Sequence, residues 1–472
     1  MPMQLSTDTE SFAISLDETE KHTLRDRRQK LAQLIDFPVI LWSGTSPSRN
    51  FPANIYPFRA SSHFLYFAGL PLENAVIRLV KGKLELFLDN PPPGAALWHG
   101  KMPSRDEIAE AIGADNAFPK SYLPEQVEEA ATILVQDAAT QAEQHQILNR
   151  LVYYPTQTKG IDRELIEAII QLRLTHDIHG LDQLRKAAEV TVAAHIAGMK
   201  GTKDATHEAN IRGVMEGVIL GQNMGVSYNS IVTVQGEVLH NQHYHHRVQP
   251  GDLLLADVGA ETPLGWAADV TRTWPVSGRF SPTQRDVYDV VLAAHDACIK
   301  AVQPGVEYEV IHFSAARVMA QGLVDLGILK GNPESLVEQD AHALFFPHGV
   351  GHILGLDVHD MEDLGDLAGY APGRSRSKRF GLGFLRLNRP LQTGMLVTIE
   401  PGFYQVPGIL NHPEYREKYE ETVNWEKLEQ FADVRGIRIE DDVLVTDTGA
   451  EILTAKLPTD ATAIEELVSS SH

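Results

Sequence analysis

Apolar residues recur at helical spacing in several stretches of the chain, and short apolar runs typical of strands separate them. The first helix is expected at about residues 21–37, where Leu24, Leu31, Leu34 and Ile35 share one face. Further helices are expected at residues 105–112, 124–148, 161–173, 181–199, 205–222 and 308–326. Strands are expected at residues 38–42, 76–80, 84–88, 231–234 and 252–257, with one more after Trp266.

Two local signals sharpen this pattern. The short turn at residues 81–83 separates two apolar runs and predicts a β-hairpin. Ser281, Pro282 and Gln284 together predict a helix start, because Ser can cap, Pro suits the first helical position and Gln completes a capping box. That helix carries an apolar stripe ending at Cys298, so we expect this cysteine in the core rather than as a reactive thiol.

The chain is longer than one hydrophobic core usually serves, so two domains are expected. A polar stretch at residues 175–180 suggests the boundary, which gives domains at residues 1–174 and 175–472. Residues 1–20 are expected to form a loose polar arm. Two polar stretches, residues 361–384 and 407–432, are expected to be surface insertions, the second of them partly helical.

Composition narrows the class of protein. A formal net charge of −22 disfavours nucleic acid and anionic membranes as partners. There is no run of the roughly 18 apolar residues that a membrane helix needs. The N-terminus lacks a basic segment followed by an apolar one, so no secretory signal is expected. A single cysteine fits a reducing compartment, and we predict a cytoplasmic protein.

Acidic residues end or interrupt apolar strands at four places: Asp257, Asp269, Glu400 and Glu440. Such a residue is costly to bury unless it is paired. An arginine or backbone amides would explain one case, but the repetition favours a shared cation. With one histidine added, four carboxylates and one imidazole suit Mn²⁺, Mg²⁺ or Co²⁺, with Zn²⁺ as an alternative.

Residues 348–360 concentrate the candidate imidazoles, with His348, His352 and His359 among three glycines. The glycines favour a loop or strand over a helix there. Upstream, the turn-like residues 261–265 predict a hairpin that brings Asp257 close to Asp269.

These motifs resemble the pita-bread metallopeptidases, in particular the Xaa-Pro aminopeptidases (aminopeptidase P) and the prolidases, over nearly the whole chain. Residues 56–59 and 64–69 are similar to the N-terminal domain of that family, and residues 322–331 to bacterial aminopeptidase P. The resemblance implies an α+β fold. A smaller mixed α/β N-terminal domain would precede a C-terminal pita-bread domain with a curved antiparallel sheet.

The resemblance also implies a metal-dependent exopeptidase with two divalent ions per subunit, Mn²⁺ foremost and Co²⁺ or Zn²⁺ as alternatives. Asp257 would chelate one ion, Asp269 and Glu440 would bridge both, and His352 and Glu400 would complete the other. A hydroxide activated by the two ions would attack the bond that precedes proline.

Further roles carry over from the resemblance. Glu400 would also shuttle a proton to the proline nitrogen. His240, His348 and His359 would contact substrate, and Arg438 would orient a metal-ligating carboxylate. Tyr404 would line the site. Trp98 is similar to a tryptophan that some members extend across a subunit interface, and the resemblance implies a homodimer or homotetramer acting on proline-containing peptides.

The resemblance leaves more than one function open. Arg386 resembles a prolidase arginine that grips a dipeptide carboxylate, and the long insertions also resemble prolidase, so a dipeptidase is the alternative to an aminopeptidase. Arg386 can also be a plain surface charge. A non-catalytic pita-bread binding protein is a further alternative, which the complete ligand set argues against. The chain also departs from some aminopeptidase P members, with Gly351 replacing a serine and Ile353 a tryptophan.

Overall fold

The computed structural model describes residues 16–470, so most of the expected polar arm lies outside the described residues. The chain forms two compact units. The first runs to Arg173 and includes Pro263–Gly265, and the second comprises Leu174–Thr262 and the chain from Trp266 onward.

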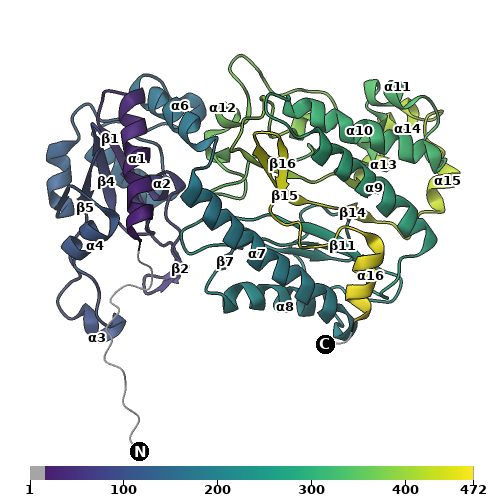
Figure 1. The fold of residues 1–472 in the computed structure, drawn as a ribbon, viewed down its shortest axis with the longest axis horizontal. Helices are drawn as coiled ribbons and strands as arrows, with labels where there is room; N and C mark the ends of the chain where they lie inside the picture. Colours follow the sequence, from purple (N-terminus) through teal and green to yellow (C-terminus); the bar gives the residue numbers. More distant parts are fainter. Residues whose placement is uncertain (1–15, 471–472) are drawn as a thin grey trace, which may run out of the picture. The chain divides into compact units, whose positions relative to one another are not determined.

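A four-stranded sheet in the order β1-β4-β5-β6 organises the first unit (Figure 1). Its strands are β1 (Val39–Trp42), β4 (Val76–Val80), β5 (Lys83–Phe87) and β6 (Asn116–Phe118), and β2 (Ser48–Phe51) pairs separately with β3 (Asn54–Ile55). The predicted hairpin is confirmed: β4 and β5 pair antiparallel, and positive φ angles at Lys81 (50°) and Gly82 (78°) form the tight turn.

The first unit also contains six α-helices within the described residues. They are α1 (Glu18–Leu34), α2 (Ser62–Ala68), α3 (Ala95–His99), α4 (Arg105–Ile112), α5 (Ala138–Ile147) and α6 (Ile161–Arg173). Of these, α1, α2 and α4 contact strands of the sheet. The first helix begins earlier than its apolar pattern predicts, because Asp17 and Glu20 form a capping box ahead of it. It buries Leu24 and Leu31 and packs beside α2 and α6.

The helix predicted at residues 124–148 is wrong in its first half. A 3₁₀ helix (Lys120–Gln126) comes first, and α5 begins only at Ala138. Between them the chain turns at residues 128–129, after which Ala131 bridges to Val39 of β1 and its carbonyl accepts from the amide of Ile40 at 2.9 Å. The apolar residues that suggested a helix are thus bound to a sheet edge, a long-range pairing that overrides local propensity.

In the second unit every strand pair is antiparallel within the described residues. Two three-stranded sheets have the orders β11-β9-β8 and β12-β15-β16, and two pairs are β13-β14 and β10-β7. The strands are β7 (Gly225–Val226), β8 (Ile231–Thr233), β9 (Leu253–Asp257), β10 (Ala260–Glu261), β11 (Thr271–Pro275), β12 (Leu396–Ile399), β13 (Gly402–Tyr404), β14 (Gly436–Arg438), β15 (Asp441–Thr446) and β16 (Gly449–Ile452).

Two helix pairs flank these strands, α7 beside α8 and α9 beside α10 (Figure 1). Their bounds are α7 (Ile178–Gly201), α8 (Glu208–Gly221), α9 (Pro282–Ala301) and α10 (Tyr308–Asp325), and α16 (Ala461–Ser469) packs against α7. The predicted start of α9 is confirmed, since Ser281 and Gln284 form a capping box. Cys298 is fully buried in that helix, as expected.

Short helices occupy the remaining connections of the second unit. They are α11 (Pro333–Glu338), α12 (Asp366–Gly369), α13 (Pro407–Leu410), α14 (Pro413–Lys418) and α15 (Trp425–Glu429). Among the helices of residues 16–470, none combines the length and apolarity that crossing a bilayer requires.

Candidate metal centre and active site

The two aspartates lie at neighbouring strand ends. Asp257 ends β9, where it faces Thr271 of β11, and Asp269 lies two residues before β11. They meet as predicted, but the connection is more than a hairpin turn, because β10 intervenes and pairs with β7. Both side chains are buried.

Tyr228 joins the two aspartates and was missed by sequence reasoning. Its hydroxyl is 2.5 Å from Oδ1 of Asp257 and 2.6 Å from Oδ1 of Asp269. One hydroxyl proton cannot fully satisfy two ionised carboxylates, so this pair calls for additional positive charge. Burial and the charge of Asp257 raise the pKa of Asp269 to about 7. Tyr228 sits in a polar segment with no periodic pattern, which gave no signal of this role.

Backbone pairing fixes the segment at residues 348–360 against β12. The amide of Thr398 donates to the carbonyl of His352 at 3.0 Å, and the amide of Glu400 donates to that of Val350 at 2.8 Å. A side chain at position 351 would overlap the carbonyl oxygen of Thr398, so this close approach requires Gly351. The segment is non-helical, as its glycines predicted.

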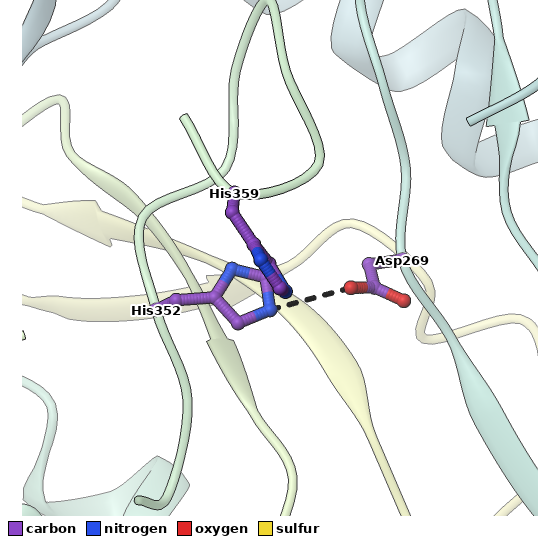
Figure 2. Close-up of side chains that lie close together, drawn as sticks. All are labelled: Asp269, His352 and His359. Carbon is purple, nitrogen blue, oxygen red and sulfur yellow. Dashed lines mark ion pairs between the residues drawn. The ribbon is translucent and has the colours of Figure 1, made fainter. Parts of the chain in front are cut away.

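The ring of His352 is oriented as a metal ligand would be. Its Nδ1 lies 3.1 Å from the carbonyl oxygen of Ile353, which can only accept, so Nδ1 carries the proton. The lone pair on Nε2 therefore faces Oδ2 of Asp269 at 3.3 Å (Figure 2) and Oε1 of Glu400 at 3.5 Å. A lone pair directed at carboxylates is repulsive by itself, whereas a cation between them would satisfy all three groups.

The two glutamates complete the cluster. Glu400 follows β12 directly, and Glu440 follows β14, where its Oε2 accepts a 2.6 Å hydrogen bond from the hydroxyl of Thr271. Burial raises the pKa of Glu400 to about 7, and burial together with Asp269 raises that of Glu440 well above its usual range. Ligand atoms lie within 4.8 Å of one another in three groups: Asp257, Asp269 and Glu440; His352, Glu400 and Glu440; and Asp269, His352 and His359. This oxygen-rich donor set fits hard or borderline divalent cations.

The guanidinium of Arg438 connects the carboxylate cluster to Thr271 and Tyr404 through hydrogen bonds. Its Nη2 donates to Oδ2 of Asp257 at 2.6 Å, its Nε to the hydroxyl of Thr271 at 2.9 Å and its Nη1 to the hydroxyl of Tyr404 at 3.0 Å. The buried guanidinium thereby holds one oxygen of Asp257 and leaves the other beside Tyr228.

His348 is hydrogen-bonded to Tyr404, the residue that Arg438 contacts. Its Nε2 lies 2.9 Å from the hydroxyl of Tyr404, and its Nδ1 donates to the carbonyl of Gly349 at 2.7 Å. Burial, with the charge of Arg438, lowers the pKa of His348 to about 3. The imidazole is therefore neutral at pH 7.

His359 and Arg386 share one carboxylate, that of Glu362. Nδ1 of His359 lies 2.5 Å from Oε2 of Glu362, and Nη1 of Arg386 forms an ion pair with Oε1. The rings of His359 and His352 meet edge to face with centroids 4.2 Å apart (Figure 2).

A cavity of about 340 Å³ opens onto these groups. It is lined by the five predicted ligands and by His240, His348, His359, Arg386 and Arg438. Apolar side chains from both insertions also line it, Phe384 from one and Ile409 from the other, which corrects the expectation that the insertions are merely surface. Trp98 lies in α3 of the first unit, where it is 81% exposed.

Two known protein families match this chain, one in each of its two compact units. The family described as metallopeptidase family M24 matches residues 182–447, and the aminopeptidase P N-terminal domain matches residues 24–135. The Xaa-Pro aminopeptidase of Escherichia coli (strain K12) is 30% identical over 97% of this chain and 100% of its own length. A probable Xaa-Pro aminopeptidase of Verticillium alfalfae is 31% identical, with 88% of each chain covered.

Solved structures agree. Proline aminopeptidase P II from Yersinia pestis superposes with a TM-score of 0.77 at 29% identity, covering 95% of this chain and 99% of the other. Pseudomonas aeruginosa aminopeptidase PepP gives a TM-score of 0.78 at 28% identity, with coverage of 95% and 98%. The chain thus has the two-domain aminopeptidase P fold and belongs to metallopeptidase family M24.

Proposed function

We propose that this protein is an Xaa-Pro aminopeptidase, which hydrolyses the peptide bond between an N-terminal residue and a following proline. The observation that carries the proposal is the convergence of four carboxylates and one correctly oriented imidazole on one cavity. Relatives that match nearly the full chain carry the name Xaa-Pro aminopeptidase, which supports the same substrate class.

Two divalent cations would bind here, most readily Mn²⁺, with Co²⁺ or Zn²⁺ as alternatives. Two of the donor groups, one with Asp257 and Asp269 and one with His352 and Glu400, share Glu440, which supports a paired site. Cations bound there would supply Lewis acidity that polarises the scissile carbonyl and lowers the pKa of water.

The protein side chains would do the remaining work. Glu400 lines the cavity beside His352 and would carry a proton to the departing proline nitrogen. Arg438 would hold Asp257 in its ligating orientation. Three imidazoles of the cavity besides that of His352 would contact the peptide, namely those of His240, His348 and His359, and Tyr404 would fix the orientation of His348.

Hydrolysis of Ala-Pro-Ala by the Mn²⁺-loaded protein tests this function. We expect release of alanine from Ala-Pro-Ala and no cleavage of Ala-Ala-Ala. A chelator should abolish the release of alanine. Asp269→Asn should remove the activity, whereas Asp289→Asn, on an exposed face of α9, should retain it. A metal-loaded protein that leaves Ala-Pro-Ala intact would contradict the proposal and favour a binding role.

The domain boundary, assembly and location are also proposals. We place the domains at residues 1–174 and 175–472, which limited proteolysis would test. We propose a homodimer or homotetramer in which Trp98 contributes to a neighbouring subunit, since Leu97 and Trp98 are 80% and 81% exposed. Light scattering on Trp98→Ala would detect a loss of assembly. A cytoplasmic location is supported by the single, buried cysteine.

A further inference from the structure

Arg386 already has an anionic partner within the chain. Its Nη1 pairs with Oε1 of Glu362, while Oε2 of the same carboxylate accepts from Nδ1 of His359 at 2.5 Å. Glu362 thus divides its two oxygens between two residues that line the main cavity.

The two neighbours of Glu362, His359 and Arg386, stabilise the negative charge of its carboxylate. One oxygen of Glu362 accepts a hydrogen bond from His359 and the other pairs with the guanidinium of Arg386, and both contacts favour the ionised carboxylate. The carboxylate is therefore ionised at neutral pH, and it offsets the charge of the guanidinium. A free peptide carboxylate would have to displace an equivalent group before it could bind Arg386.

A second cavity lies next to the ion pair of Glu362 and Arg386. This cavity of about 180 Å³ shares His352, His359 and Arg386 with the main one, and Glu362 and Arg376 line it as well. The pair formed by Glu362 and Arg386 therefore lies where the two cavities adjoin. A peptide that extends past its proline would continue into this second cavity, and an internal peptide group, unlike a free carboxylate, would bring no negative charge to Arg386.

We propose that Glu362 is a specificity-determining residue, which masks Arg386 from the free carboxylate of Xaa-Pro dipeptides and so directs the enzyme towards longer peptides. The proposal rests on the proposed peptidase function. It accounts for an arginine that by itself would favour a dipeptidase in a chain similar to enzymes named Xaa-Pro aminopeptidase.

Glu362→Gln isolates the charge. The glutamine oxygen can still accept a hydrogen bond from His359, but the negative charge that Glu362 places beside the guanidinium of Arg386 is removed. The probes are Ala-Pro and its C-terminal amide, which differ only in the carboxylate. Binding of Ala-Pro, measured by calorimetry on the Mn²⁺-loaded protein, should tighten about tenfold, as expected for one charge-assisted hydrogen bond, while binding of the amide should not change. The kcat/KM for Ala-Pro relative to Ala-Pro-Ala should rise by a similar factor, mainly through KM.

Two further variants make the result specific. Glu307→Gln removes an equal charge from an exposed ion pair with Arg374 elsewhere in the same unit and should leave the preference for Ala-Pro-Ala unchanged. Adding Arg386→Ala to Glu362→Gln should cancel the gain. The proposal is overturned if Glu362→Gln binds both probes as the wild type does. Failure of the wild type to cleave Ala-Pro-Ala would instead contradict the peptidase function, and the contrast between the two probes would still report whether Glu362 masks Arg386.

Discussion

The hydroxyl of Tyr404 donates a 2.9 Å hydrogen bond to Nε2 of His348. Because Arg438 donates to that hydroxyl and His348 donates onward to the carbonyl of Gly349, the chain of hydrogen bonds has one direction. It sets both the tautomer and the orientation of an imidazole that lines the cavity.

Tyr404→Phe should therefore impair catalysis without removing metal. Loss of the hydroxyl leaves Nε2 of His348 without its donor, and we expect kcat/KM for Ala-Pro-Ala to fall by about tenfold or more. Metal content should match the wild type, since Arg438 still contacts Asp257. Tyr288→Phe is the control, because its buried hydroxyl bonds the carbonyl of Thr459 at 2.7 Å outside the site. Equal losses in both variants would indicate a general packing effect.

Tyr228→Phe should weaken metal binding. The hydroxyl contacts both Asp257 and Asp269, and removal of such a partner of the ligands costs about 10- to 100-fold in metal affinity. Titration of the metal-free protein with Mn²⁺ measures the change. Tyr244→Phe loses a hydroxyl bonded to the carbonyl of Ser230 in the same region and should keep its affinity. Unchanged affinity in Tyr228→Phe would rule out the role.

Removal of metal should destabilise the second unit. Ligand atoms from Asp257, Asp269 and Glu440 lie within 4.8 Å of one another, so their mutual repulsion is relieved by a bound cation. At a free Mn²⁺ concentration of 100 Kd, binding adds about 2.7 kcal/mol to the free energy of unfolding. A chelator should therefore lower Tm by several degrees, and excess Mn²⁺ should restore it. Asp269→Asn should largely lose this Mn²⁺-dependent shift.

His312 should make the fold sensitive to acid. It is fully buried, and within residues 16–470 neither ring nitrogen has a hydrogen-bond partner. Burial, followed by the charge of His342, lowers its pKa to about 3, against about 6.5 when unfolded. The unfolded chain therefore binds a proton below about pH 6.5 that the folded chain does not, so stability falls as the pH falls towards 3.

At pH 5 this amounts to about 2 kcal/mol from His312. His312→Phe should reduce the drop in Tm between pH 7 and pH 5, whereas His22→Phe, at an exposed position of α1, should not. Identical pH dependence in His312→Phe and the wild type would contradict this assignment.

Local signals in the sequence predicted much of the fold. The cap at Ser281 and the turn at Lys81-Gly82 were found because their chemistry lies within a few residues. The extended stretch around Ala131 was missed because its partner, β1, lies some 90 residues earlier, so no local pattern reports it.

The candidate site divides in the same way. Acids on apolar strands are conspicuous in sequence, and their repetition predicts all four as ligands of a shared cation. Tyr228 and Glu362 were not, since each acquires its role only through contacts formed by folding, such as the one between Tyr228 and Asp269, 41 residues apart. The positions of Phe384 and Ile409 in the cavity wall could not be predicted for the same reason.

The backbone pairing that fixes residues 348–360 against β12 has a consequence for how the site is loaded. His352 and Glu400 are positioned by hydrogen bonds that form when the polypeptide folds, and Gly351 permits the close approach. The hydrogen-bonded main chain therefore fixes the positions of these donor groups, and cations bound there would exchange in the native state with little reorganisation. The scaffold should accept successive metals in vitro without refolding, so that reactivity can be compared between ions on one unchanged frame.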